Sequence, residues 1–329
     1  ALLLCLFLIL GQGLWAATQG PGLVLESPVR CVNGQDCFIQ NYVDHDPGHG
    51  FQDYACGSLG YDGHTGTDLR PLDPKAVRHG VEVLAAAAGV VRAVRDGMAD
   101  LGARGTAPEV LEHSGGGNMV ILEHPDGWST AYAHLRQDSI RVAQGQRVEA
   151  GQVLGLVGLS GRTEFPHVEL SVRKDGRPVD PFRGLDDSPQ CGPGSAPLWS
   201  PAALASLAYA PSALAGAGFA SEPPDRGQAT NADRLSVLSP AVVFWVQFLG
   251  ARPGDDLLLR LTGPDGTVLA EHRETLDRAQ AQRSIYIGKR RRVAPWPPGT
   301  YIGTCTLTLR SPSGEPPAAL SAERRVDIR

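Results

Sequence analysis

His64 and Asp68 are the pair of side chains in this sequence best suited to chemistry. They lie four residues apart in the hexapeptide 63–68, which reads Gly-His-Thr-Gly-Thr-Asp. Its two glycines allow a tight loop, so an imidazole nitrogen and a carboxylate oxygen can converge on one metal ion. The pair predicts half of a metal site, and the other half has to come from elsewhere in the chain.

Two later histidines stand at the ends of apolar, strand-like runs. Because side chains alternate between the two faces of a strand, His134 is expected on the same face as Tyr132. By the same rule, His167 is expected on the same face as Glu169. Each run therefore has one polar face, and these faces together with the His-x-x-x-Asp loop predict a single site.

Zinc suits such a set of donors. It binds imidazole nitrogen and carboxylate oxygen at about 2.0–2.2 Å, and three protein ligands leave a fourth position for water. The pKa of that water falls to about 7 on the metal. Histidines that do not bind the metal can then transfer protons or stabilise the oxyanion of a tetrahedral intermediate. These residue types therefore favour a hydrolytic metal site.

The segment from about 61 to 183 resembles the lysostaphin-like (LytM-type) zinc peptidases, which cut peptide cross-links in bacterial peptidoglycan. The likeness rests on three motifs: Gly63-His64-x-x-x-Asp68, Tyr132-Ala133-His134-Leu135, and Gly158-x-x-Gly161 followed by Phe165-Pro166-His167-Val168-Glu169. The stretch 148–158 also resembles the core hairpin of that family. The resemblance covers a little over a third of the chain, and the motifs are specific in combination.

The resemblance implies a Zn2+ ion bound by His64 and Asp68, with His134 and His167 as catalytic histidines. In the family the last strand carries His-x-His, and the second of these histidines is the third ligand. This chain has Glu169 there, on the predicted face of His167, so the expected metal ligands are His64, Asp68 and Glu169. A second carboxylate makes zinc less electropositive and its bound water less acidic.

The glutamate at position 169 leaves two functions to be distinguished. The first is an exported zinc-dependent endopeptidase that hydrolyses peptide cross-links of bacterial peptidoglycan. The second is a catalytically degenerate member that binds peptidoglycan or activates other cell-wall hydrolases. Degenerate members often lose several site residues, whereas this chain keeps four of five and has a potential ligand at the fifth. The sequence therefore favours the enzyme.

The N-terminal residues predict a secretory signal peptide. Residues 1–10 are apolar, and the small residues Ala16 and Ala17 suit cleavage. The apolar run is too short to span a bilayer comfortably, and no other stretch of the sequence is suited to it. The mature protein is therefore expected to be periplasmic or secreted, without a membrane span.

The cysteines are expected to form disulfides in such an oxidising compartment. Cys31 and Cys37 are close enough to pair across a short loop, and Cys56 can pair with Cys191 because both flank the histidine-containing segment. Cys305 is then left over. Sequence does not fix the connectivity. The absence of a C-x-x-C pair disfavours a zinc–thiolate site.

The charge of the chain bears on its partners. With a net charge of -5 and a pI near 6.0, the chain lacks the excess of positive charge that is typical of proteins that bind nucleic acid or anionic lipid. The basic run 289–292 is short and indicates a solvated loop. Nucleic acid is therefore not an expected partner, whereas the family resemblance implies peptidoglycan and, for the degenerate alternative, other cell-wall hydrolases.

Short apolar runs between turn signals predict a mainly β protein. We expect a lysostaphin-like antiparallel β catalytic domain followed by an immunoglobulin-like β-sandwich. Hairpins are predicted at the turns 125–127 and 263–266. The predicted order is a signal peptide at 1–17, an irregular segment at 18–60, the peptidase-like domain at 61–185, a Pro/Ala/Gly-rich linker at 186–230 and the sandwich at 231–329.

The other histidines of the first 185 residues are predicted to be solvated surface residues, because each stands beside proline, glycine or a charged turn. They are His45, His49, His79, His113 and His124.

Overall fold

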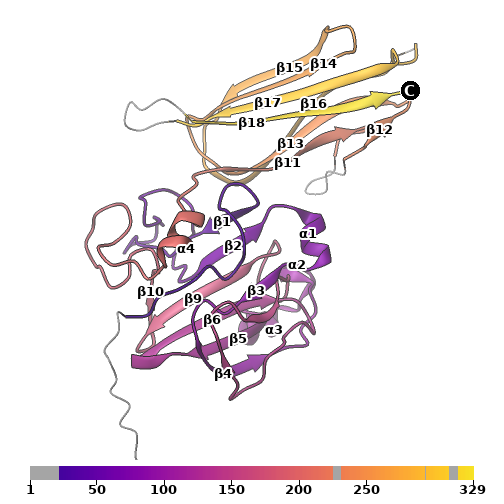
Figure 1. Ribbon diagram of the computed structural model, residues 1–329. Helices are drawn as coiled ribbons and strands as arrows, with labels where there is room; N and C mark the ends of the chain where they lie inside the picture. Colours follow the sequence, from indigo (N-terminus) through magenta and orange to yellow (C-terminus); the bar gives the residue numbers. More distant parts are fainter. Residues whose placement is uncertain (1–21, 225–230, 293, 311–317) are drawn as a thin grey trace, which may run out of the picture.

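The computed structural model describes residues 22–224, 231–292, 294–310 and 318–329, so the predicted signal peptide lies outside the described residues. Figure 1 shows two β units, one formed by the earlier part of the chain and one by the later part. The mainly β fold class predicted from the sequence is confirmed. Within the described residues, no helix has the length and apolar character needed to cross a membrane.

The first unit is built on an antiparallel sheet in the order β1-β2-β9-β6-β5-β4-β7, with β10 paired to β9. Its strands are β1 (Cys37–Asn41), β2 (Thr67–Pro71), β4 (Gly89–Arg95), β5 (Asn118–Glu123), β6 (Trp128–Leu135), β7 (Arg147–Val148), β9 (Val168–Lys174) and β10 (Arg177–Val179). A separate pair, β3 (Glu82–Leu84) and β8 (Val153–Leu156), contributes to the same hydrophobic core. The helices are short: α1 (Pro74–His79), α2 (Gly102–Gly105), α3 (Pro108–Ser114) and α4 (Pro201–Ser206).

Strand β9 shows why the main sheet has one apolar face in the core and one polar face. Val168, Leu170 and Val172 alternate along it and are buried in the core. Burying such a side chain stabilises the fold by roughly 1.5–3 kcal/mol. Glu169 and Ser171 point to the other face, as the alternation predicts. The apolar residues thus fix the register that presents the polar ones.

Two strands lie in segments where the sequence predicted no strand. Strand β1 falls in the segment 18–60, predicted to be irregular, and β11 (Ala213–Ala220) falls in the predicted linker. Each is held by a neighbouring strand, β1 by β2 and β11 by β13 (Ala241–Ala251). Their strand character depends on these partners more than on local residue preference, which is weak for strands. The positions of the domain boundaries stay a prediction.

The second unit consists of two sheets that share one core. One sheet has the order β11-β13-β16 and the other β12-β18-β17-β14-β15. The remaining strands are β12 (Arg234–Leu235), β14 (Asp256–Thr262), β15 (Val268–Thr275), β16 (Gln280–Arg290), β17 (Gly299–Thr308) and β18 (Ala319–Ile328). The predicted hairpin at 263–266 joins β14 to β15. We call this unit the C-terminal sandwich; its immunoglobulin-like classification stays a prediction.

The two units are in direct contact. Strand β1 forms one end of the main sheet, and the C-terminal sandwich lies against it (Figure 1). Leu249 of β13 is fully buried in the core of the first unit. The side-chain amide of Gln40 on β1 donates to the carbonyl of Ala281 on β16 at 2.8 Å. The sandwich therefore covers a strand that would otherwise expose unpaired backbone groups.

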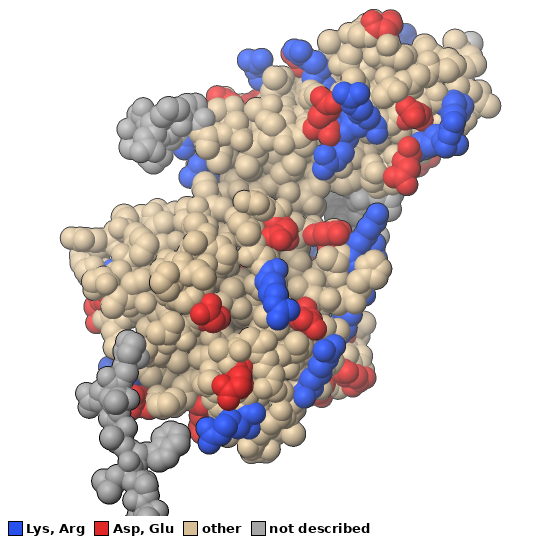
Figure 2. Space-filling model, viewed as in Figure 1, with Lys and Arg blue, Asp and Glu red and all other residues tan. Residues whose placement is uncertain are grey.

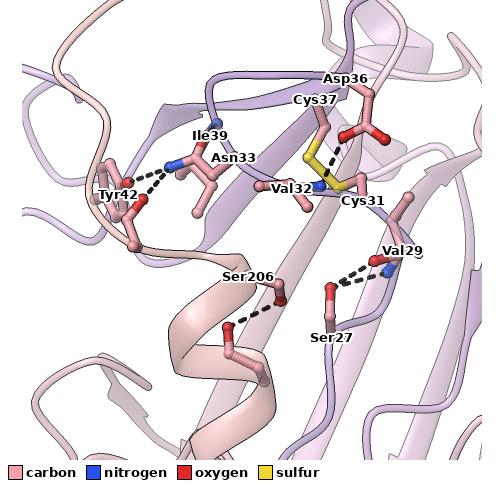
Figure 3. Close-up of a disulfide and its surroundings, with 12 residues drawn as sticks. Ser27, Val29, Cys31, Val32, Asn33, Asp36, Cys37, Ile39, Tyr42 and Ser206 are labelled. Carbon is pink, nitrogen blue, oxygen red and sulfur yellow. Dashed lines mark hydrogen bonds between the residues drawn. A yellow bond between two sulfur atoms is a disulfide. The ribbon is translucent and has the colours of Figure 1, made fainter.

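Both predicted disulfides are present, Cys31–Cys37 and Cys56–Cys191, and the remaining described cysteine, Cys305, is free and buried. Figure 3 shows the first bridge at the start of β1. It closes a small loop that holds Asn33 in place.

The bridge between Cys56 and Cys191 closes a loop of 135 residues and should contribute most to stability. Replacing both cysteines by alanine is expected to lower the free energy of unfolding by up to roughly 5 kcal/mol, because the unfolded chain regains the entropy of that loop. The same change at Cys31 and Cys37, which are separated by 6 residues, should cost roughly 2 kcal/mol. Denaturant titration of the two variants gives the comparison, and an equal or reversed order would contradict it.

Candidate metal centre

Three neighbouring strands bring the predicted site residues together. Asp68 on β2 lies opposite Glu169 on β9, and Glu169 lies opposite Ala133 on β6. His64 lies in the loop before β2, and His167 immediately precedes β9. Residues from three separated segments therefore meet on the polar face of the sheet.

His134 reaches this face through a bulge. The pairing of β5 with β6 shifts register beside Met119, so that Ala133 and His134 together lie opposite that one residue. His134 has a φ of 61°, in the left-handed region, as is common where an extra residue enters a strand. The prediction that His134 shares a face with Tyr132 is therefore wrong. Tyr132 points into the core, and the bulge turns His134 toward Glu169.

The side chains form one compact cluster. Oδ1 of Asp68 lies 3.4 Å from Nε2 of His64 and 3.5 Å from Nε2 of His167. Nε2 of His134 lies 3.4 Å from Oε2 of Glu169, and the rings of His134 and His167 are 4.7 Å apart. Glu169 is partly exposed and the other four residues are buried. The cluster therefore opens to solvent at the glutamate.

Each of the three imidazoles is oriented by a backbone carbonyl. Nδ1 of His64 lies 2.8 Å from the carbonyl of Tyr42, and Nδ1 of His134 lies 2.8 Å from that of Ser160. For His167, the corresponding distance to the carbonyl of Phe165 is 2.9 Å. A carbonyl can only accept, so each Nδ1 carries the proton and donates it. All three Nε2 atoms therefore present a lone pair to the centre of the cluster when the ring is neutral.

The two carboxylates are also held in place. The amide of Asn41 on β1 donates to Oδ2 of Asp68 at 2.7 Å, which leaves Oδ1 facing the histidines. The hydroxyl of Ser171 donates to Oε1 of Glu169 at 3.0 Å. Gly66 makes room for this glutamate, because a Cβ at that position would lie 2.6 Å from Oε1. The glycine of the His-x-x-x-Asp loop thus allows a longer side chain at position 169.

The arrangement fits a divalent metal ion. One donor atom each from His64, Asp68 and Glu169 lie within 4.8 Å of one another. Nε2 of His64 and Oδ1 of Asp68 are buried and have no hydrogen-bond partner among the described residues. Burying such atoms without a partner is costly, and coordination of a cation would remove that cost. A nitrogen and two oxygens within this span are donors that zinc accepts.

Comparison with known proteins agrees with this geometry. Residues 62–181 match the family model of peptidase family M23. The chain contains an M23 domain. The match begins two residues before His64 and ends after Asp180, so it contains the whole cluster but not Asn41 and Tyr42.

Related proteins match the M23 domain over short stretches. The peptidoglycan DD-endopeptidase ShyB of Vibrio cholerae is 39% identical over 74 residues, which are 22% of this chain and 17% of ShyB. The DD-carboxypeptidase/endopeptidase Mpg of Neisseria meningitidis serogroup B is 36% identical over 102 residues, or 31% of this chain and 21% of Mpg. A solved zinc-containing peptidase from Vibrio cholerae is 28% identical, with 46% of this chain and 39% of that chain covered and a TM-score of 0.28. The chain therefore spans about a fifth or less of the curated relatives' own length.

The charges within the M23 domain stabilise one another in the absence of metal. Burial opposes protonation of His64 and His167, but the carboxylate of Asp68, 3.4 and 3.5 Å from their Nε2 atoms, outweighs it and raises the pKa of both imidazoles above 6.5. Burial raises the pKa of Asp68, yet the two histidines hold it well below 3.8. Burial also raises the pKa of Glu169. The neighbouring His134 outweighs this effect, so the pKa of the Glu169 carboxyl lies below 4.5. Protons and a metal ion therefore compete for the same nitrogen of His64.

This competition predicts opposite pH dependences for the metal-free and zinc-bound protein. Histidines whose pKa is raised on folding stabilise the metal-free protein fully below pH 6.5, and this stability is lost as pH rises through the raised values. Carboxylates whose pKa is lowered stabilise it above about pH 4.5, and this is lost as pH falls. The melting temperature in EDTA should therefore fall between pH 6 and 8. The additional stability conferred by zinc should rise over the same interval, and parallel curves would contradict the assignment.

A cavity of about 1340 Å³ adjoins the M23 site on the side of His64. Its walls come from residues 43–56, 62–65 and 174–190. The ring of Tyr61 packs on His64 with ring centroids 4.5 Å apart and is half exposed beside the site. Burial and the charges of Asp68 and Glu169 raise the pKa of Tyr61, so its phenol stays protonated and can donate at neutral pH.

Two of the histidines predicted to be solvated surface residues make specific contacts. His124 is buried, and its two ring nitrogens lie 2.7 Å from the carbonyl of Ala88 and 2.9 Å from Oγ1 of Thr130. The prediction for His124 is wrong, because a residue at a strand end can still fold back over its own hairpin. His45 is exposed, as predicted, but pairs with the buried Asp180 at 2.7 Å. His49, His79 and His113 are also exposed.

Several residues that orient the site were not predicted from the sequence. Asn41 and Tyr42 lie in a segment without any chemical motif, and only the pairing of β1 with β2 brings them to the site. Ser160 and Phe165 act through backbone carbonyls, for which side-chain type gives no signal. The glycines around Ser160 are the exception, because a Cβ at Gly161 would lie 2.3 Å from a backbone oxygen. Such glycines indicate close backbone approach.

Proposed function

We propose that this chain is an exported zinc-dependent endopeptidase that hydrolyses peptide cross-links of bacterial peptidoglycan. One observation supports this more than any other. Three histidine Nε2 atoms and two carboxylates converge at one place, and two of these buried polar atoms have no partner within the described residues. Coordination of a cation would give these two atoms the partner that the described residues do not supply.

We assign His64, Asp68 and Glu169 as the residues that hold the metal. When bound, zinc supplies Lewis-acid activation of a water molecule and of the scissile carbonyl. Glu169 reaches the site from β9, which begins directly after His167, and the hydroxyl of Ser171 donates to one of its oxygens. Because two of the three ligands are anionic, the site should favour cations that accept oxygen donors more than a two-histidine site does.

His134 and His167 are then the proton-transferring residues. Their Nδ1 atoms are engaged by carbonyls, so Nε2 is the basic position of each ring. Nε2 of one ring can take a proton from the attacking water and deliver it to the leaving amine. The protonated form of the other ring can stabilise the oxyanion that develops on the scissile carbonyl. The separation of 4.7 Å between the rings allows both to serve one peptide bond.

The assignment of substrate and location rests on the relatives and the cysteines. The names of ShyB and Mpg state DD-endopeptidase and DD-carboxypeptidase/endopeptidase activities, and that of ShyB also names peptidoglycan. Both disulfides suit an oxidising compartment, which agrees with the predicted signal peptide and with a periplasmic or secreted protein. On the face shown in Figure 2, acidic and basic side chains are interspersed, as expected for a protein without a polyanionic partner.

The direct test combines metal analysis with digestion of purified peptidoglycan. The proposal expects about one zinc per chain and the release of cross-link fragments, with both lost in a chelator and restored by zinc. Mass spectrometry of the fragments identifies the bond that is cut. Intact peptidoglycan together with no bound zinc would contradict the proposal. A gain in the activity of another cell-wall hydrolase under those conditions would support the degenerate, hydrolase-activating function instead.

A further inference from the structure

The C-terminal sandwich contacts the M23 domain through the polar face of the sheet. Arg70 lies on β2 two residues after Asp68 and therefore on the same face. One terminal nitrogen of its guanidinium donates to Oε1 of Gln40 at 2.9 Å, and the other donates to Oε1 of Gln282 at 3.1 Å. Gln282 belongs to β16 of the sandwich. Gln40 also contacts this strand, through the carbonyl of Ala281.

Arg70 connects this interface to a catalytic histidine. Its guanidinium lies over the ring of Phe165, 4.7 Å from the centroid. The ring of Phe165 packs in turn on that of His167, with centroids 4.7 Å apart. The carbonyl of Phe165 accepts from Nδ1 of His167. Phe165 therefore contributes to the tilt of the His167 imidazole and, together with Oγ1 of Thr163 at 3.1 Å, to the placement of the proton on its Nδ1.

We propose that Arg70 is a positioning residue through which the C-terminal sandwich holds His167 in its catalytic orientation. The planar guanidinium of Arg70 suits this role. Its two terminal nitrogens donate to Gln40 and Gln282, and the face of the same group remains free to cover the ring of Phe165. Burial lowers the pKa of Arg70 to about 10, so the group remains charged at neutral pH. This role rests on the proposed function only for its effect on hydrolysis.

The test uses full-length variants with a matched control. Gln282→Ala removes the contact from the sandwich, and Arg70→Met removes the fork while keeping an apolar stem. Ser284→Ala is the control, because Ser284 is also exposed on β16 but bonds only to Gln247 within the sandwich. The side-chain nitrogen NMR signals of His167 report the orientation without requiring activity. His124, whose contacts are remote from Arg70, supplies the reference signals.

We expect Gln282→Ala and Arg70→Met to shift the His167 signals and leave those of His124 unchanged. Hydrolysis should fall about tenfold or more in kcat for Arg70→Met and less for Gln282→Ala, with KM unchanged. Unmoved His167 signals in both variants would overturn the proposal, as would an equal effect of Ser284→Ala. If the wild type proves inactive while the signals still shift, the positioning role stands and the proposed function fails. Gln282→Ala alone decides the matter if Arg70→Met does not fold.

Discussion

Asp68→Asn is expected to abolish stoichiometric zinc binding and to lower zinc affinity by at least about 100-fold. Mutating a residue that only hydrogen-bonds to a ligand already lowers metal affinity by about 10–100-fold, and loss of a ligand should lower it more. The substitution keeps the shape of the side chain, so packing is preserved. Asn41 donates to Oδ2 of Asp68, and the new amide must offer its oxygen to that donor. Its NH2 group then faces Nε2 of His64 and His167 and cannot bind a cation.

Calorimetric titration of the metal-free protein with zinc measures this loss, and peptidoglycan digestion should disappear with it. Asp62→Asn is the matched control, because this exposed carboxylate is close in sequence but outside the cluster. Circular dichroism of both variants checks that the fold is retained. Wild-type affinity in Asp68→Asn would remove this carboxylate from the metal site.

Glu169→His is expected to act in the opposite direction and raise zinc affinity by about tenfold, because imidazole is a better donor for zinc than a carboxylate. The change also removes one negative charge from the ligand set. Water activated at the site should become more acidic, so the acid limb of the pH–activity profile should move down by roughly one unit. Gly66 places no side chain against residue 169.

Glu169→Gln provides the control for this prediction. It keeps the length of the glutamate and the contact with Ser171 but loses the anionic donor, so zinc affinity should fall. If neither variant changes zinc affinity, Glu169 is not a ligand. The site would then be held by His64 and Asp68 alone, and the degenerate function would gain support.

The sequence predicted the residue types of the site better than their placement. His167 and Glu169 share a face because plain alternation along β9 holds. His134 breaks the same rule, since the register shift opposite Met119 depends on the pairing of two strands. No pattern within β6 alone can indicate such a bulge.

The role of the N-terminal segment could not be predicted from its own residues. Residues 37–41 carry few signals of a strand, yet they pair with β2 along its length. The contribution of this segment to the site comes from an amide and a backbone carbonyl. Such groups occur in every irregular segment, so their role becomes visible only when the fold brings them to a metal-binding residue.

The position of Asn41 and Tyr42 also limits how this protein can be taken apart. A fragment cut to the boundaries of the family match, residues 62–181, would contain every proposed ligand and both histidines proposed to transfer protons. It would lack the carbonyl that orients His64 and the amide that orients Asp68. The segment that matches the family is therefore shorter than the segment that holds the cluster in place. A fragment that includes β1 is expected to keep the geometry of the cluster, and one that omits β1 is expected to lose it.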